Sequence, residues 1–257
     1  GSQLDNIKTD HDQIQLTYLL EDRDGSWDFS TTIYNNEFER NWFKLAKVNG
    51  IGITNILNDP NTYATEMSYL KGADSGDNAL TNRNNARSYY SRGIQAQLGN
   101  NFDWSSVSLR SVLGVRLHKD EEDRLQDDDK FKMQNGVMVM TSDGAPGSAT
   151  NRVSDAKANS IFWSGDIEFG KWTLEPGIRY EKIKMTRNDY STSDADRVNG
   201  PTKVRESKID VVIPGFGALY AINENWSLLG GIYKGYNPPA PGSESDAETS
   251  VNYEAGT

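Results

Sequence analysis

Few residues of this sequence have the types and spacing that catalysis requires. Its two histidines, His11 and His118, lie far apart and have no recognisable motif around them. Carboxylate pairs such as Asp166 and Glu168 could act as an acid and a base, but a spacing of two residues is also what one face of a strand gives its polar side chains. Cysteine is absent, which excludes a thiol nucleophile and a zinc–thiolate site. We therefore predict no catalytic residue and no cofactor.

Two acidic runs, residues 120–123 and 127–129, place several carboxylates in short stretches. A calcium ion takes about 6–8 oxygen ligands, but neither run has the spacing of the D-x-[DN]-x-[DN]-G calcium loop. We interpret both runs as parts of a solvated acidic loop, and no metal site is predicted.

The bulk properties narrow the class of protein further. The chain has 257 residues and a formal net charge of −10. No basic stripe is present that could neutralise phosphates, so a nucleic-acid partner is not expected. No run of about 18 apolar residues occurs, so no membrane-spanning helix is expected. A chain of this length can form one large all-β domain.

Alternating apolar and polar residues predict antiparallel hairpins. Ile14, Leu16 and Tyr18 fall on one face of a segment whose other face is mostly polar, which is the period of a strand. Short turns join such segments into four hairpins, and the connections between the hairpins are long and polar. The hairpins cover residues 14–33, 89–118, 160–183 and 209–236, and the long connections cover residues 37–85, 119–156 and 184–207.

Short turns on one rim and long loops on the other are typical of transmembrane β-barrels. The predicted fold is all-β: a partial, antiparallel up-and-down transmembrane β-barrel of about 8–10 strands with long extracellular loops. A soluble antiparallel sheet is the alternative. Aromatic residues near the strand ends would form the interfacial girdle, namely Trp27, Trp172, Tyr220, Trp226 and Tyr236.

Turn and breaker residues add local expectations. Asn58-Asp59-Pro60 predicts the start of a short helix that ends before Gly72. Asn135-Gly136 predicts a small hairpin within the second long connection. Pro176 and Pro214 predict a bulge or another irregularity in their strands.

The segments NWSLLGGIYKGYNPPAPG (225–242) and NYEAG (252–256) resemble TonB-dependent outer-membrane receptors, especially the ferric dicitrate transporters. Further stretches fit the same family in the same order, among them YYSRGIQAQL (89–98) and IPGFGALY (213–220). A TonB-contacting segment and a plug are not recognisable. We therefore expect residues 1–257 to be a single barrel domain truncated at the C-terminus, which meets TonB only through a plug absent from this chain.

The resemblance implies a function in the bacterial outer membrane, with lipid around the barrel and uptake of a ferric chelate such as an iron–siderophore or ferric citrate. Guanidinium groups suit an anionic chelate because they pair bidentately with carboxylates. By strand parity or by their place beside the first loop, the candidate ligand-binding residues are Arg116, Arg179, Arg87, Arg40, His118 and Tyr89. An adhesin or structural surface barrel without cargo, and a small outer-membrane enzyme, remain as alternatives.

Overall fold

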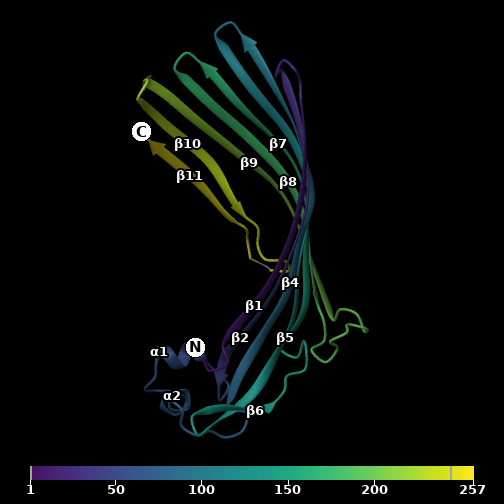
Figure 1. Cartoon of the computed structure of the whole chain (residues 1–257), viewed down its shortest axis with the longest axis vertical. Helices are drawn as coiled ribbons and strands as arrows, with labels where there is room; N and C mark the ends of the chain where they lie inside the picture. Colours follow the sequence, from purple (N-terminus) through teal and green to yellow (C-terminus); the bar gives the residue numbers. More distant parts are fainter. Residues whose placement is uncertain (1, 244) are drawn as a thin grey trace.

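The computed structural model describes residues 2–243 and 245–257, and it is dominated by one curved antiparallel sheet (Figure 1). Sequence neighbours pair with one another in the order β1-β2-β4-β5-β7-β8-β9-β10-β11, so the topology is up-and-down, with β1 and β11 at the two edges. The principal strands are β1 (Asn6–Glu21), β2 (Trp27–Val48), β4 (Leu80–Trp104), β5 (Val107–Gln134), β7 (Thr150–Phe169), β8 (Trp172–Asp189), β9 (Lys203–Asn223), β10 (Trp226–Asn237) and β11 (Glu248–Gly256). The all-β, up-and-down prediction is confirmed, as an open sheet.

The two rims of the sheet differ as expected. Residues 105–106, 170–171 and 224–225 are tight turns on one rim, at the top of Figure 1. The opposite rim carries the short elements β3 (Ile51–Gly52), α1 (Ile53–Asn58), α2 (Ala64–Leu70) and β6 (Val137–Ser142). Four of the expected girdle aromatics, Trp27, Trp172, Tyr220 and Trp226, lie near strand ends at the tight-turn rim, whereas Tyr236 is near the other end of β10.

The predicted lengths of the loops are wrong. Strand β2 continues to Val48 and β5 continues to Gln134, so much of what was expected to be loop is sheet. Both acidic runs therefore lie within β5 and are not in a solvated loop. The physical reason is that these strand extensions carry polar residues on both faces, so the apolar alternation that marks a strand is lost while backbone pairing continues.

The turn and breaker residues gave mixed results. Asn135 and Gly136 have φ of 51° and 75° and connect β5 to β6, so the small hairpin is confirmed. The helix expected before Gly72 is α2, but it begins at Ala64. Asp59 ends α1 instead, and its Oδ1 accepts the Thr62 N–H at 3.2 Å in the turn before α2. The irregularities expected at the two prolines occur as interruptions of pairing. The β7–β8 ladder breaks opposite Pro176, and β9–β10 pairing ends one residue from Pro214.

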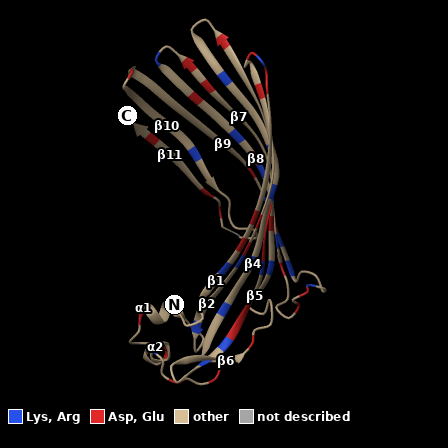
Figure 2. Cartoon of the chain, in the orientation of Figure 1, with Lys and Arg blue, Asp and Glu red and all other residues tan. Residues whose placement is uncertain are grey.

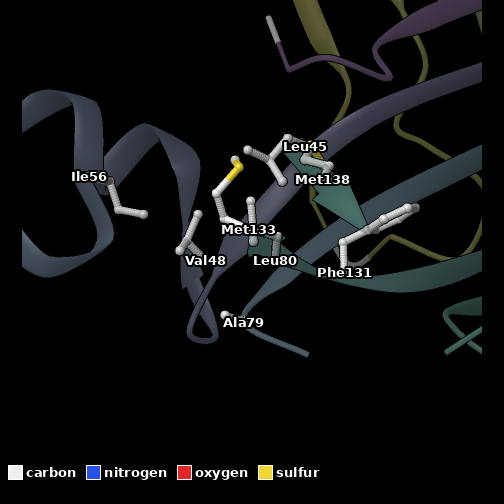
Figure 3. Packing of buried hydrophobic residues seen from close by; sticks show 8 residues of the cluster. All are labelled: Leu45, Val48, Ile56, Ala79, Leu80, Phe131, Met133 and Met138. Carbon is white, nitrogen blue, oxygen red and sulfur yellow. The ribbon is translucent and has the colours of Figure 1, made fainter. Parts of the chain in front are cut away.

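A small hydrophobic core lies at the long-loop rim and fixes α1 against the strands (Figure 3). Ile56 of α1 is fully buried with Val48 of β2 and Leu80 of β4. Side chains from β5 and β6 complete the cluster, whose members are Leu45, Val48, Ile56, Ala79, Leu80, Phe131, Met133 and Met138. Residues 49–79 are thus held as a packed cap.

Truncation of this core is expected to release the cap. Leu80→Ala removes a side chain that is 1% exposed, which costs about 2–5 kcal/mol for a buried leucine. Limited proteolysis should then cut residues 49–79 much faster than in the unmodified chain. Leu57→Ala is the matched control, because Leu57 lies on α1 but is 58% exposed. Equal cleavage of the two variants would contradict a packed cap.

The two faces of the sheet differ in chemistry. Cross-strand partners share a face, and the register Leu16↔Ile33↔Ile94↔Leu117 places exposed aliphatic side chains side by side on four strands. We name this side the apolar face. Its apolar band, for example residues 109–117 of β5 and 172–180 of β8, has the length of about 9–11 residues that a tilted strand needs to cross a bilayer.

The other side, named the polar face, is concave. The connection between β10 and β11 lies on the concave side of the sheet (Figure 1), and its Gly242 approaches Arg205 and Arg187 of the polar face. Beyond the apolar band, towards the long-loop rim, both faces carry charged residues, and Figure 2 shows these charges along β4 and β5. Within the described residues, no helix is long and apolar enough to cross a membrane.

Candidate ligand-binding site

A row of arginines crosses the polar face beyond the apolar band. Arg40 of β2 is opposite Arg87 of β4, Arg87 is opposite Arg124 of β5, and Arg124 is opposite Arg152 of β7. Like charges in directly opposite positions destabilise a sheet. Such a row therefore needs negative charge from elsewhere.

The residue opposite Arg152 on β8 is Asp189, and two further arginines lie one row away on the next strands. Arg187 of β8 and Arg205 of β9 face each other close to the row, since Ser154 of β7 lies opposite Arg187 and two residues from Arg152. We name Arg40, Arg87, Arg124, Arg152, Arg187 and Arg205 the arginine cluster.

Two carboxylates neutralise the arginine cluster only in part. Glu122 accepts a hydrogen bond from Arg87 at 3.0 Å and lies 2.7 Å from Nε of Arg124. Asp189 lies 2.8 Å from Arg187 and also pairs with Arg205. In the part of the chain that the structure describes, Arg40 and Arg152 have no ion-pair partner. The cluster therefore keeps a net positive charge.

Several donors in the arginine cluster lack acceptors. The Nε atoms of Arg40, Arg87 and Arg152 are buried and have no hydrogen-bond partner among the described residues. An unsatisfied buried donor costs about 1–3 kcal/mol. An anion with several oxygens placed here would accept these bonds and balance the charge.

The pKa shifts of Arg152 and Glu122 have the directions expected beside an excess of positive charge. Burial lowers the pKa of the Arg152 guanidinium, and the neighbouring charges of Arg124 and Arg187 lower it further. Burial of Glu122 acts to raise its pKa, but the hydrogen bond and charge of Arg124 dominate and hold that pKa below its usual value. Glu122 is therefore ionised, while the arginines repel one another.

The arginine cluster borders a hollow of about 460 Å³. Arg124, Arg152 and Arg187 line one part of it, together with Asp120, Glu121 and Glu122, and Phe38 and Tyr89 line another. The Tyr89 ring stacks on Phe38 with centroids 5.8 Å apart. Ala240 and Pro241, from the β10–β11 connection, also border the hollow, so it lies between the sheet and this loop. The volume is suited to a small chelate.

The structure brings together three of the six predicted ligand-binding residues. Arg40 Nη2 donates to the Tyr89 hydroxyl at 3.2 Å, and Arg87 Nη1 donates to the same oxygen at 3.4 Å. All three side chains lie at the arginine cluster. Sequence reasoning placed Arg40 and Arg87 in or beside a loop, whereas both belong to strands.

The other three predicted residues lie nearer the tight-turn rim, on the polar face at the level of the apolar band. Arg116 Nη2 donates to the Tyr34 hydroxyl at 2.8 Å, and this hydroxyl is 2.6 Å from Nδ1 of His118. Arg179 donates to Ser160 Oγ at 2.7 Å and pairs with Glu181. Their donors are engaged with the wall itself.

Sequence reasoning missed four members of the arginine cluster. Arg124 and Arg152 fell in the supposed connection 119–156, and Arg187 and Arg205 fell in 184–207. A signal was present in the alternation of Glu122, Arg124 and Gln126, which has the period of one strand face. Without an apolar partner set on the other face, that alternation was not recognised as a strand.

The acidic clusters that could suggest metal binding make other contacts in the structure. Across residues 2–243 and 245–257, no group of three or more His, Cys, Asp or Glu side chains is arranged to hold a metal ion. Residues 127–129 alternate between the two faces, and Asp128 pairs with Arg83 at 2.7 Å.

A curved up-and-down sheet with an apolar outer band and a cationic concave face is a β-barrel wall of the receptor type. Residues 1–257 match the family described as TonB dependent receptor-like, beta-barrel, and the chain belongs to that family. The family is one of receptors and transporters and is not an enzyme class.

Solved structures of receptors share the fold at low sequence identity. The open form of the ferric-catecholate import receptor Fiu from Escherichia coli K12 matches with a TM-score of 0.66 and 13% identity over 93% of this chain and 37% of its own. The siderophore receptor PiuA from Acinetobacter baumannii matches with a TM-score of 0.66 and 13% identity over 98% of this chain and 38% of its own. BauA, the ferric preacinetobactin receptor of the same organism, matches with a TM-score of 0.62 and 12% identity over 98% of this chain and 36% of its own. This chain spans little more than a third of their length.

Proposed function

We propose that this chain is a single barrel domain of a TonB-dependent receptor in the bacterial outer membrane, and that the receptor takes up an anionic ferric chelate captured at the arginine cluster. The observation that carries this proposal is the row of four facing arginines, three of which keep a buried Nε without an acceptor. Fiu is a ferric-catecholate import receptor and BauA is a ferric preacinetobactin receptor, and their similarity to this chain supports the same class of cargo.

The chemistry favours a chelate whose surface displays oxygen anions. Ferric iron would remain in the chelate, and the protein would contact only the chelating groups. Guanidinium forks donate two parallel hydrogen bonds to a carboxylate and stay charged at any physiological pH. Ferric citrate is therefore the specific cargo we propose, with the anionic iron–siderophores as the wider class. Tyr89 and Phe38 would supply an apolar edge to the hollow.

The remaining predicted residues fit a second position on the tight-turn side of the arginine cluster. Arg116, His118 and Arg179 lie on the same polar face, nearer the tight-turn rim. A chelate released from the cluster would meet them next along the wall. The apolar band would contact outer-membrane lipid, and energy from TonB would reach the ligand through the plug of the receptor.

The test compares chelates that differ in charge. The full-length receptor in detergent is titrated with ferric citrate and with a neutral ferric hydroxamate, and tryptophan fluorescence reports binding. Tight binding of ferric citrate that weakens steeply with salt is expected, because exposed charges are screened within about 10 Å at 0.1 M salt. Equal affinity for both chelates would contradict a role for the arginine cluster. Binding of neither would favour a structural or adhesive surface barrel.

A further inference from the structure

A second row of cations crosses the opposite side of the sheet, on the apolar face. Arg92 of β4 is opposite Lys119 of β5, Lys119 is opposite Lys157 of β7, and Lys157 is opposite Lys184 of β8. Lys184 is in turn opposite Lys208 of β9. We name these five residues the basic belt. Five strands thus place like charges directly beside one another, which is unfavourable unless a partner supplies negative charge.

The basic belt lies at the boundary of the apolar band. Ile94 lies two residues from Arg92 along β4, and Leu117 lies two residues from Lys119 along β5. Both Ile94 and Leu117 belong to the apolar band. Such a step is about 6.6 Å along a strand. Four of the five side chains are exposed and Lys119 is half-buried, so the cations are accessible.

Cations and aliphatic side chains also share one hollow on this face. Arg92, Lys119 and Lys157 line it together with Ile94 and Leu117. A molecule with an acyl chain and an anionic headgroup could contact both kinds of lining at once. A free anion would use the cations and leave the aliphatic part uncovered.

The carboxylates nearby lie mainly on the side of the basic belt that is away from the apolar band. Glu121 is 3.8 Å from Lys119, and Glu206 is 2.9 Å from Lys184. Both belong to the next row towards the long-loop rim, which also contains Tyr90 and a third carboxylate, Asp155. On the band side the neighbouring row contains Lys182 opposite Asp210. The belt therefore presents net positive charge towards the apolar band.

We propose that the basic belt binds the phosphate groups of lipid headgroups in the leaflet that surrounds the long-loop rim. The proposal rests on the proposed function in one respect, that the apolar face contacts a bilayer. Lysine is a compact charge on a flexible stem, which suits headgroup phosphates that have no fixed spacing. The belt follows the register across five strands, so it would hold several headgroups side by side.

The test uses the full-length receptor in detergent and three probes: lipopolysaccharide with both lipid A phosphates, its dephosphorylated form, and inorganic phosphate. Bound lipid is counted by native mass spectrometry. We expect the phosphorylated lipid to bind, and the variant K119Q/K157Q/K184Q to weaken that binding at least tenfold. The control K71Q/K132Q/K203Q removes the same charge from positions outside the belt and should bind as the unmodified receptor does. A heat-dependent gel shift confirms that each variant is folded.

Three outcomes would overturn the proposal: equal binding of the dephosphorylated lipid, unchanged binding by the belt variant, or displacement of the lipid by an equal concentration of inorganic phosphate. The last outcome would assign the belt to free phosphate. Ferric citrate binding is measured on the same samples. An unmodified receptor that binds the lipid but not ferric citrate would contradict the proposed cargo alone. An unmodified receptor that binds ferric citrate but not the lipid would contradict the basic belt alone.

Discussion

Replacement of Arg124 and Arg152 together by glutamine is expected to weaken ferric citrate binding to the full-length receptor by roughly 100-fold or more. A hydrogen bond to a charged group contributes about 1.5–3 kcal/mol, and about 1.4 kcal/mol corresponds to a tenfold change in Kd. Both residues line the hollow beside the β10–β11 connection. Glutamine keeps a donor and much of the side-chain length, so the loss would report on charge and on the guanidinium fork.

The matched control for this double variant is Arg110→Gln. Arg110 belongs to the same polar face but pairs with Asp28 at 2.7 Å near the tight-turn rim, far from the hollow. Its replacement should leave the Kd for ferric citrate within about twofold. The salt dependence of binding should also become less steep in the double variant and stay unchanged in the control. A Kd that is the same in the double variant and the unmodified receptor would exclude the arginine cluster as the capture site.

The sequence allowed the hairpins to be predicted within the apolar band but not beyond it. Residues 160–183 were recognised as a hairpin because Ile161, Trp163 and Ile167 alternate with polar residues, and Gly170 supplies a turn. In residues 119–130 both faces carry mostly charged or polar side chains, so periodicity carries little hydrophobic signal there. Backbone hydrogen bonds to β4 and β7 hold that part of β5 in the sheet.

The ligand-binding site was predictable only in part, for a related reason. Arg40, Arg87 and Tyr89 were selected individually, and the structure places them together. The arginine row itself depends on the register of four strands. Register is a property of paired strands, so the residues of one segment alone cannot show that Arg124 and Arg152 complete the row.

The acidic residues at the far end of β5 lead to a second prediction with a large effect. Asp127 lies beyond the apolar band and is 7% exposed. Burial raises the pKa of its carboxyl to about 6, and the negative charges of Asp129 and Asp143 add to the shift. Asn84 donates one hydrogen bond to it at 3.1 Å, which is not enough to offset these effects.

The sign of the pH dependence follows from this raised pKa. Because folded Asp127 holds its proton more tightly than the unfolded chain does, protonation stabilises the fold. That contribution is fully present below the ordinary pKa of 3.8 and is lost as the pH rises through about 6. Asp127→Asn, which resembles the protonated form, should therefore stabilise the long-loop rim by up to about 3 kcal/mol at pH 8, since one pKa unit corresponds to about 1.36 kcal/mol. The gain should shrink at pH 5 and vanish below pH 4.

Asp128→Asn is the matched control, because Asp128 adjoins Asp127 but points to the opposite face. Burial acts to raise the Asp128 pKa, but two hydrogen bonds from Arg83, at 2.7 and 2.9 Å, hold it below the usual value. Its replacement should destabilise the rim by about 1–3 kcal/mol at pH 8, and this loss should fade as the pH falls through the lowered pKa. Hydrogen exchange of residues 125–134 would measure both effects. Opposite signs at pH 8 are expected, and destabilisation by both variants would mean that the Asp127 carboxylate has a favourable partner when ionised.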